Sequence, residues 1–415
     1  MSDIYLACGL RTPFVKAGTH FAQRSALELS VPVARSMSQR ARPDFLVWGQ
    51  VIPDPGLSNI GRELVYEAEL DRHIPAYATI MACSTSFTGT LQAAGMLGRG
   101  GAHLALVGGV ESMSHVPIGL KYKVAERLVG ELAKSPAGAV AALQKLTAAD
   151  FDLPTKGWAN RVSGRTMGEH MEDTAKEFGI TRADQDQRAL QSHRGAVAAQ
   201  DAGFFGDLIV PVFGVDHDTF PRRDTSLEKL SSLPPVFDRA SGSITAGNSS
   251  PLTDGAASVW VADHEGLQRL GESPAVRLVD WEIGAVDFVV DGMLMAPARA
   301  IPRLLARHRL RAEQIALWEI HEAFSAQVVA NVKAASDPVY RREKAGVEFD
   351  TGAVPVGRIN PNGGSVAIGH PFGATGARIL SQAVKELTGM PSGEKAIVSV
   401  CADGGQGTVA LLERV

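Results

Sequence analysis

The chain has 415 residues, of which 45% are hydrophobic and 21% are charged, and its formal net charge is −4 at pH 7. This length predicts two or three domains with a large hydrophobic core. Lysines and arginines are scattered along the chain, which argues against a nucleic-acid-binding surface. No window approaches the ~20 apolar residues that a membrane-spanning helix needs.

The cysteine count favours a reducing compartment. Only Cys8, Cys83 and Cys401 are present, widely spaced and without a C-x-x-C pair, which argues against a disulfide framework and against a Cys-rich zinc site. The first residues, MSDIYLACGLRTPF, lack a basic leader followed by an apolar stretch, and the final LLERV is not a peroxisomal signal. We therefore expect a cytoplasmic protein.

Short apolar runs bounded by glycine or polar residues predict buried strands, and helical periodicity separates several of them. In chain order, the expected strands are DIYLACG (3–9), FLVWGQV (45–51), HLALVGGV (103–110), IALWEI (315–320) and KAIVSVC (395–401). Apolar residues at helical spacing predict helices over 84–97 and 375–388. This alternation is typical of an α/β protein.

The two predicted helices belong to an internal repeat. Residues 83–109 run from a small-residue turn through a helix to a buried strand that ends in Gly-Gly, and residues 370–405 repeat this order. Each helix would begin beside a reactive residue, Cys83 in one case and His370 in the other. The sequence therefore predicts two duplicated α/β halves.

Residues 119–250 are more charged and polar than the flanking sequence, and we interpret them as a long insertion that sits on the first half. The insertion opens with a charged amphipathic pattern in which Val124, Leu128 and Leu132 share one face. This pattern fits a solvated helix, a contact with a partner subunit or attachment to a membrane surface. The insertion ends in a segment rich in Gly, Ser, Thr and Asn, GSITAGNSSPLTDGAASVWVAD (242–263), which is typical of a ligand-contacting loop.

Four residues could carry chemistry, namely Cys83, His370, Cys401 and His321. At a helix N-terminus the thiol pKa of Cys83 would be lowered, which would make it a nucleophile, although a free cysteine is commonly a small buried hydrophobe. His370, between Gly369 and Pro371, could be a general base or a structural histidine. Cys401 ends a strand before the glycine turn ADGGQG, and taken alone it would be a core residue, as would Cys8.

His321 directly follows the predicted strand IALWEI. A metal site is not expected here, because the residue four positions on is Ser325 rather than histidine and no further ligand cluster is visible. A histidine at a strand-to-helix junction could instead donate a hydrogen bond to an oxyanion.

Taken together, these segments resemble the thiolases over nearly the whole chain and in the same order. The matching segments are GLRTPF (9–14), MACSTS (81–86), GGVESMS (108–114), TAGNSSPLTDGA (245–256), HEAF (321–324), NGGSVAIGHPFGATGAR (362–378) and CADGGQG (401–407). GGVESMSHVP, HEAF and GHPFGATG are most similar to the β subunits of fatty-acid β-oxidation trifunctional complexes. Other thiolases usually have Asn at the position of His321, and NPNGG is nearer the biosynthetic type.

The resemblance implies a layered αβαβα core built from two halves with a loop-domain insertion. Its expected boundaries are 1–118 plus 251–272 for the N-terminal half, 119–250 for the CoA-binding loop domain and 273–415 for the C-terminal half. It implies no permanently bound cofactor and no metal, with coenzyme A acting as a substrate. The expected assembly is a homodimer or homotetramer, with a hydratase/dehydrogenase α subunit as a further partner.

The resemblance also implies roles for the site residues. Cys83 would carry the acyl group, His370 would take its proton, and Cys401 would act as acid and base at carbon and at CoA. His321 and His370 would stabilise an enolate, while the backbone N–H groups of Cys83 and Asp403 would form the second oxyanion hole.

The position of Asp403 is Gly in many thiolases, so we expect the carboxylate to point away from the developing charge. Ser250 would contact pantetheine, and Met167 and Phe324 would line the acyl tunnel. Without the resemblance, Ser250 would be interpreted as a turn residue, and Met167 and Phe324 would be interpreted as core residues.

The implied activity is CoA-dependent cleavage of a 3-oxoacyl-CoA, which is reversible as a Claisen condensation. A biosynthetic, acetoacetyl-CoA-forming thiolase remains an alternative. A β-ketoacyl synthase would not be expected to pair its nucleophile with a second cysteine in a C-x-x-G-G-x-G turn. A non-catalytic subunit of an oxidation complex would be expected to lack one of Cys83, His370 and Cys401, and all three are present.

Overall fold

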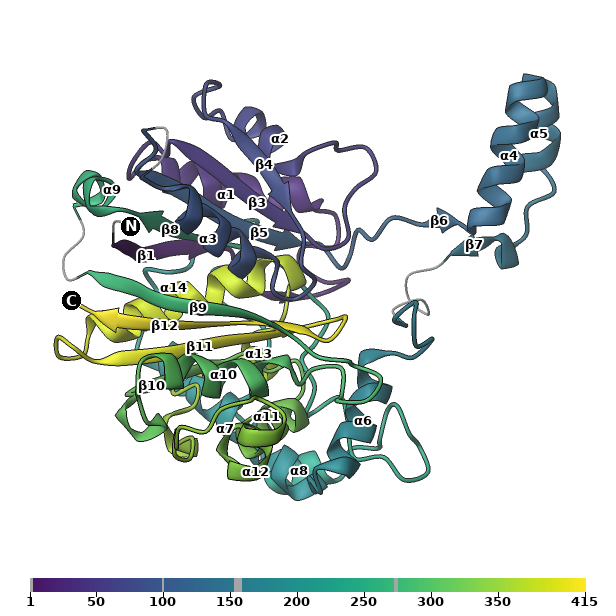
Figure 1. Cartoon of the computed structure of the whole chain (residues 1–415). Helices are drawn as coiled ribbons and strands as arrows, with labels where there is room; N and C mark the ends of the chain where they lie inside the picture. Colours follow the sequence, from purple (N-terminus) through teal and green to yellow (C-terminus); the bar gives the residue numbers. More distant parts are fainter. Residues whose placement is uncertain (1–2, 99–100, 153–158, 272–274) are drawn as a thin grey trace.

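The computed structural model describes residues 3–98, 101–152, 159–271 and 275–415. Its centre is a sheet that runs through both halves of the chain (Figure 1). The strand order is β10 (Leu317–Ile320), β11 (Lys395–Ala402), β12 (Gln406–Arg414), β9 (Val276–Ala285), β1 (Ile4–Arg11), β8 (Thr253–Ala262), β5 (Leu104–Glu111), β3 (Phe45–Gln50) and β4 (Ala76–Thr79). The short β2 (Val15–Lys16) pairs with β8.

The predicted repeat is present in the sheet. In the first half β3 is parallel to β5, and β5 is antiparallel to β8; in the second half β10 is parallel to β11, and β11 is antiparallel to β12. The helix before β5 is α3 (Thr85–Met96), and the helix before β11 is α14 (Thr375–Thr388). Antiparallel pairing of β1 with β9 joins the halves, so the prediction of two duplicated α/β halves is confirmed.

Alternation along the strands produces the layers. Helices α3 and α14 pack together in the central core, against one face of each half-sheet, where Val47 and Val398 contribute. The opposite face of the first half-sheet, including Trp48, packs under α1 (Ala26–Ser38) and α2 (Ile60–Glu67). The opposite face of the second, including Ile397, packs under α10 (Ala296–Arg307) and α11 (Ser325–Ser336). The result is the expected αβαβα order.

Glycine allows the two central helices to approach closely. A Cβ at Gly376, in the first turn of α14, would lie 2.3 Å from the backbone nitrogen of Phe87 in α3. A Cβ at Gly109 in β5 would lie 2.1 Å from the carbonyl oxygen of Gly373, just before α14. Contacts this short are available only to glycine, so they bring the segment that contains His370 against the first half of the molecule.

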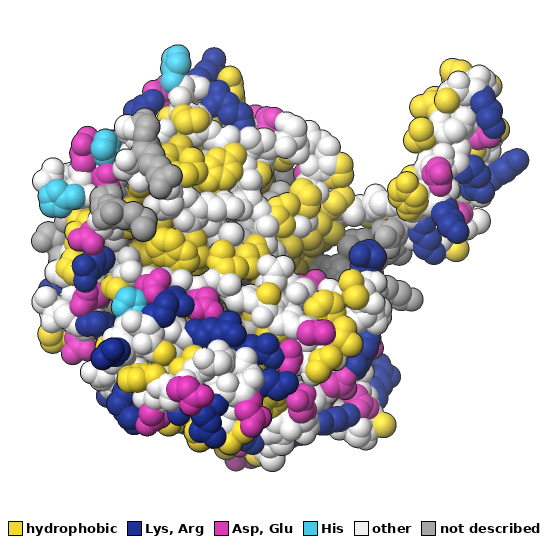
Figure 2. All heavy atoms as spheres, viewed as in Figure 1, with side chains coloured by type: hydrophobic (Ala, Val, Ile, Leu, Met, Phe, Trp, Pro, Cys, Tyr) yellow, Lys and Arg dark blue, Asp and Glu magenta, His cyan; other side chains and the backbone are white. Residues whose placement is uncertain are grey.

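The segment between β5 and β8 forms two separate substructures. A hairpin of α4 (Tyr122–Lys134) and α5 (Pro136–Leu143) projects away from the body, and apolar side chains are visible on its surface (Figures 1 and 2). Its base carries β6 (Gly119–Leu120), the 3₁₀ turn Ala148–Asp150 and β7 (Phe151–Asp152). Nearer the core lie α6 (Met167–Glu177), α7 (Arg182–Asp201) and α8 (Leu227–Ser231).

The expectation that the whole insertion sits on the first half is wrong. Helix α7 packs against α11 and against α13 (Ser365–Ile368), which both belong to the second half, and α6 also packs against α11. The reason is a buried ion pair between Arg188 of α7 and Glu322, whose atoms Nη2 and Oε1 are 2.9 Å apart. Other parts of the insertion bond back to the first half: the carbonyl of Leu208 accepts the N–H of Arg11, and the carboxylate of Asp218 pairs with the Arg11 side chain.

The remaining elements are short. They are α9 (His264–Leu270), α12 (Pro338–Glu343) and the 3₁₀ turns Ala312–Gln314, Val356–Arg358 and Phe372–Ala374. Within the described residues, no helix combines the length and the apolar character needed to cross a membrane.

Candidate active site

Cys83 lies immediately before the N-cap of α3, as expected. The preceding Ala82 has φ 45°, a left-handed conformation that is uncommon for a residue other than glycine. The Oγ of Thr85 stabilises this turn, since it accepts the N–H of Met81 and donates to the carbonyl of Ala82. The cap residue Ser84 makes no side-chain cap and instead pairs with Thr408 of β12. The turn therefore holds the cysteine backbone in one orientation.

The resting Cys83 is a neutral thiol. Part of its surface is exposed, but the sulfur is closely surrounded by protein, and burial raises its pKa to about 12. The negative charges of Asp403 and Glu111 act in the same direction, whereas the backbone N–H groups of Asp403 and Cys83 oppose them. The expectation of a lowered pKa is therefore wrong, because desolvation outweighs the effect of the helix N-terminus.

His370 is a buried, neutral imidazole with one free nitrogen. Its Nδ1 lies 2.6 Å from Oγ of Thr375, and that hydroxyl donates its own proton to the carbonyl of Pro371. Thr375 must therefore accept from Nδ1–H, which leaves a lone pair on Nε2. Burial lowers the His370 pKa to about 3, and Nε2 has no partner in the described part of the chain. Nε2 of His370 can therefore accept a proton, and its role as a general base stays a prediction.

His321 lies directly beside His370. It follows β10, and its N–H donates to the carbonyl of Ser399 at 2.8 Å. Its Nδ1 lies 2.9 Å from Oγ of Ser365, and its Nε2 has no partner among the described atoms. Burial lowers the pKa of His321 well below its usual range, and the nearby His370 and Arg378 add to this effect. Both imidazoles are therefore uncharged near neutral pH.

The fold brings Cys83, His321 and His370 together. The sulfur and one ring nitrogen of each histidine all lie within 4.8 Å of one another. A thiol, an imidazole base and an imidazole donor at this spacing can form and stabilise a covalent acyl adduct. A thiol and two imidazoles at this spacing could also hold a metal ion. The sequence did not reveal this cluster, because the three residues are far apart along the chain. That no metal is required stays a prediction.

Cys401 lies at the end of β11, opposite Gly407 of β12. Its side chain is 1% exposed, and burial together with the nearby Cys83 raises its pKa well above the usual range. The following turn requires glycine, because Gly405 has φ 72° and a Cβ there would lie 2.6 Å from the carbonyl oxygen of Val286. A second neutral thiol thus adjoins the first.

Asp403 is held by hydrogen bonds to its carboxylate. Oδ1 accepts from the side-chain amide of Asn160 at 2.9 Å and from the N–H of Gly404 at 2.6 Å. These contacts tie the turn after β11 to the insertion. The charge nevertheless reaches the sulfur, since Asp403 raises the pKa of Cys83. The carboxylate therefore opposes thiolate formation in spite of its two partners.

The three residues expected to contact CoA or the acyl chain occupy one region. The backbone N–H and the hydroxyl of Ser250 both donate to the carbonyl of Ala323 at 3.0 Å. Phe324 and Met167 belong to the same apolar cluster as Cys401, and the ring of Phe324 packs edge-on to Phe237 at 6.1 Å. Their proposed contacts with substrate stay predictions.

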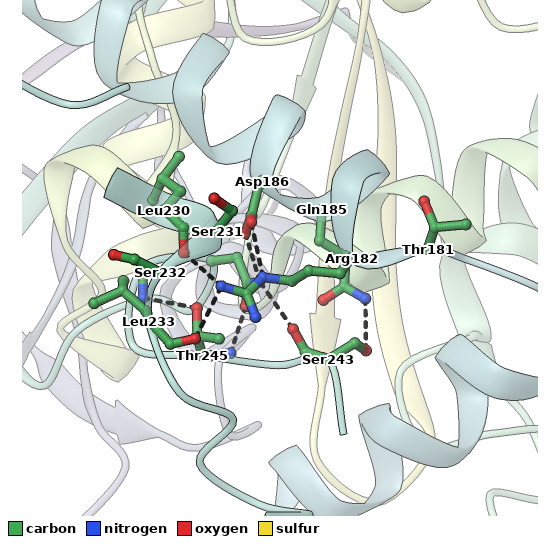
Figure 3. Close-up of polar contacts among 12 residues, drawn as sticks. Thr181, Arg182, Gln185, Asp186, Leu230, Ser231, Ser232, Leu233, Ser243 and Thr245 are labelled. Carbon is green, nitrogen blue, oxygen red and sulfur yellow. Dashed lines mark hydrogen bonds and ion pairs between the residues drawn. The ribbon is translucent and has the colours of Figure 1, made fainter. Parts of the chain in front are cut away.

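Polar contacts from the start of α7 hold the loop that leads to Ser250 (Figure 3). Nη2 of Arg182 donates to the carbonyls of Leu230 and Leu233, and its Nε pairs with Asp186. The other carboxylate oxygen of Asp186 accepts from the side chain of Asn248 at 3.0 Å, and Gln185 donates to Ser243 at 2.8 Å. The insertion thus fixes the path of residues 243–249.

Two buried carboxylates support the site and were not identified from the sequence. Glu322 accepts hydrogen bonds from the side chains of Arg188, Ser192 and Asn360 and from the N–H of Val366. It therefore connects the segment after His321 to α7 and α13. Its position inside the HEAF segment was a signal, but the partners could not be assigned without the fold.

The second of these carboxylates, Glu111 at the end of β5, accepts the N–H groups of Val51, Ile52 and Gly373. Burial raises its pKa to about 7. Glu111 thus ties the turn that follows His370 to the first half of the molecule. Glu111 lies in the GGVES segment that the sequence analysis identified, but the segment did not indicate this role.

Comparisons with known proteins match the chain over nearly its whole length. Residues 4–265 match the family model "Thiolase, N-terminal domain", and residues 272–414 match "Thiolase, C-terminal domain". The 3-ketoacyl-CoA thiolases of Shewanella loihica and Yersinia pestis are each 36% identical to the chain, covering 99% of it and 96% of the relative.

Solved structures show the same similarity. An acetyl-CoA acetyltransferase from Bacillus anthracis has a TM-score of 0.84 at 28% identity, covering 100% of this chain and 99% of that one. A thiolase from Ascaris suum, solved in complex with coenzyme A, has a TM-score of 0.80 at 26% identity, with complete coverage of both chains.

Proposed function

This chain belongs to the thiolase family, and we propose that it cleaves 3-oxoacyl-CoA with coenzyme A to acetyl-CoA and a shortened acyl-CoA. The observation that carries the proposal is the convergence of Cys83, His321 and His370 within 4.8 Å, with Cys401 adjoining them. Full-length similarity to proteins named 3-ketoacyl-CoA thiolase supports the reaction class.

In the first half-reaction, the sulfur of Cys83 attacks the 3-keto carbon while Nε2 of His370 takes the thiol proton. The pKa values of about 12 and about 3 mean that a free thiolate–imidazolium pair does not accumulate before the substrate reacts. Proton transfer therefore accompanies carbon–sulfur bond formation. The bond between carbons 2 and 3 then breaks, and Cys401 protonates the acetyl-CoA enolate at carbon.

In the second half-reaction, Cys401 takes the proton of the incoming CoA thiol. The CoA sulfur attacks the acyl group on Cys83, the carbon–sulfur bond to Cys83 breaks, and the thiolate recovers its proton from His370. In reverse, Cys401 removes the α-proton of acetyl-CoA and the enolate attacks the acyl-enzyme. Coenzyme A is a substrate in both directions, and the mechanism needs neither a permanently bound cofactor nor a metal.

Two groups of donors would stabilise the negative charge. The backbone N–H groups of Cys83 and Asp403 face the tetrahedral oxygen, and their influence on the Cys83 sulfur supports this assignment. Nε2 of His321 faces the enolate oxygen together with Nε2 of His370, which at that stage carries the proton taken from Cys83. A donor of this kind typically contributes about 3 kcal/mol to the barrier reduction. Ser250, Met167 and Phe324 are proposed to contact the pantetheine and the acyl chain.

We propose the degradative subtype, in the manner of the trifunctional β subunits, and the names of the matched relatives support it. The second candidate is a biosynthetic thiolase that forms acetoacetyl-CoA. It is favoured by the NPNGG segment and by similarity to the Bacillus anthracis acetyl-CoA acetyltransferase. The two candidates differ in the acyl chain length that Cys83 accepts.

We also propose a cytoplasmic homodimer or homotetramer whose α4–α5 hairpin contacts a hydratase/dehydrogenase subunit. Support comes from the apolar side chains that the hairpin exposes, including Tyr122 at 82%, Val129 and Leu132. Co-purification with such a subunit supports this contact, and liposome flotation without co-purification indicates a membrane surface instead. If the protein shows neither association, the hairpin is a solvated element and the proposed contact is wrong.

The decisive experiment is CoA-dependent cleavage of 3-oxoacyl-CoAs from short to long chain by the purified protein. We expect acetyl-CoA release at one or more lengths and its loss in Cys83→Ala. The matched control is Cys8→Ala in β1, a half-buried cysteine outside the site. Absence of cleavage at every length, or activity that survives Cys83→Ala, contradicts the proposed function.

A further inference from the structure

The hydroxyl of Ser365 links His321 to a buried arginine. Ser365 is the first residue of α13 and has no exposed surface. Its Oγ lies 2.9 Å from Nδ1 of His321 and 2.8 Å from Nη2 of Arg378 in α14. Three separate segments thus meet at a single oxygen atom behind the active-site cluster.

Arg378 fixes the direction of one of these hydrogen bonds. A guanidinium carries only N–H donors, so Oγ of Ser365 accepts from it. Burial lowers the pKa of Arg378 only to about 10, because the carboxylates of Glu319 and Glu322 favour the charged form. The arginine therefore remains a cation near neutral pH and occupies one lone pair of the serine at all times.

The remaining proton of Ser365 determines the state of His321. Within the described residues, His321 Nδ1 is the other hydrogen-bond partner of this hydroxyl. If the hydroxyl donates to Nδ1, all three groups are satisfied. If Nδ1 carried the proton, two N–H groups would point at one oxygen and the buried O–H would lack an acceptor, which typically costs about 1–3 kcal/mol.

We propose that Arg378 and Ser365 are positioning residues that fix neutral His321 with its proton on Nε2. Among the described residues this nitrogen is buried without a partner, and one ring nitrogen of His321 lies within 4.8 Å of the Cys83 sulfur and of a His370 nitrogen. Because Nδ1 is engaged by Ser365, Nε2 becomes the hydrogen-bond donor into the site. The arrangement at His370 is the reverse, because Thr375 gives its proton to Pro371 and accepts from Nδ1. One hydroxyl donates to its histidine and the other accepts, so the adjacent rings carry opposite tautomers.

The consequence for catalysis rests on the proposed function. A donor at Nε2 of His321 can stabilise an enolate oxygen, while the lone pair at Nε2 of His370 can accept a proton. Two rings with the same tautomer would provide two bases or two donors. The serine and the arginine thus give neighbouring histidines complementary roles although neither touches the substrate.

The tautomers can be measured without turnover. The probe is the full-length, unliganded protein with 15N-labelled histidine near pH 7, observed by NMR at both ring nitrogens. The His321 signals are assigned by their loss in His321→Asn, which carries the residue that other thiolases usually have. We expect the proton of His321 on Nε2 and that of His370 on Nδ1. A proton on Nδ1 of His321 overturns the proposal.

Substitutions at Ser365 supply a second, functional readout. We expect Ser365→Ala to shift His321 towards the other tautomer and to lower kcat about tenfold or more with little change in KM. Ser365→Thr keeps the hydroxyl and is expected to retain the tautomer. An unchanged tautomer in Ser365→Ala, with kcat within about twofold of wild type, overturns the assignment.

The matched control is Ser30→Ala in the outer layer. Ser30 is also fully buried, accepts an N–H from Trp48 and donates to the carbonyl of Ala26. It is expected to leave both the tautomer and kcat unchanged. If Ser365→Ala does not fold, the wild-type tautomer still decides the question. If the wild-type protein does not cleave 3-oxoacyl-CoA, the proposed function is contradicted. The tautomer of His321 is measured without turnover, so it still tests the present proposal.

Discussion

The imidazole rings of His321 and His370 lie 4.2 Å apart between centroids and are tilted by 48°. Each ring is buried, and each is held through Nδ1 by a different hydroxyl, Ser365 or Thr375. Two histidines this close cannot both be charged at a reasonable cost, and burial lowers both pKa values. Before His370 takes the proton of Cys83, the pair therefore consists of two neutral groups that differ in hydrogen-bond polarity.

We predict that Cys83→Ala abolishes acyl-enzyme formation while the fold persists. The substitution removes the sulfur but keeps the left-handed turn at Ala82 and the start of α3. Rapid mixing with a 3-oxoacyl-CoA followed by mass spectrometry should show the acyl adduct in wild type and in Cys8→Ala, and none in Cys83→Ala. An adduct on another residue would contradict the assignment of the nucleophile.

We predict that Asp403→Asn lowers the pKa of Cys83. The carboxylate raises that pKa, and an amide removes the charge while keeping an acceptor for Asn160 and the backbone N–H that acts on the sulfur. Alkylation of Cys83 by iodoacetamide should therefore accelerate at fixed alkaline pH.

The control for this prediction is Asn160→Ala, which removes the partner and leaves the charge, so it should not accelerate alkylation. An unchanged rate in Asp403→Asn would contradict the electrostatic effect. Turnover is a separate test of the carboxylate's position. If the carboxylate points away from the oxyanion, Asp403→Ala should raise kcat by less than about tenfold.

We predict that stability falls as the pH drops below 6.5, partly because of His370. Its folded pKa is about 3 and its ordinary value is 6.5, so in this window the unfolded chain binds a proton that the folded protein does not. Between pH 7 and pH 5 the loss from this group is about 2 kcal/mol. Urea unfolding at both pH values should show a smaller loss in His370→Asn. The exposed His217→Asn serves as the control, and an equal loss in both variants would contradict the prediction.

We predict opposite effects for two glycine-to-alanine substitutions in the central helices. A Cβ at Gly376 meets the backbone of Phe87 at 2.3 Å, so Gly376→Ala should cost about 3 kcal/mol and reduce activity, because it displaces the adjacent Thr375 that holds His370. Gly95 in α3 is exposed, and no atom of the described residues lies within 4 Å of its added Cβ, so Gly95→Ala should stabilise by about 0.5–1 kcal/mol. Thermal unfolding separates them, and similar changes in both would be inconsistent with the close helix contact.

Sequence periodicity predicted the strands and the central helices because burial on one face imposes a pattern that is visible locally. The repeat that begins at Cys83 and His370 predicted the duplicated halves in the same way. The resemblance added the layered order and the expected roles of Cys401 and Asp403. The location of the insertion was predicted incorrectly, because its attachment depends on a buried pair between Arg188 and Glu322, and nothing in the local pattern identifies such a partner.

By itself the sequence determined which residue types stand at the starts of α3 and α14 and at the ends of β10 and β11, since these depend on short-range signals. The tertiary structure alone decided the protonation states. The Cys83 pKa of about 12 arises from surrounding protein atoms, and the two tautomers depend on Ser365, Thr375 and Arg378. Desolvation and hydrogen-bond direction are properties of distance in space, so residues far apart in the chain acquire them only when the fold brings them together.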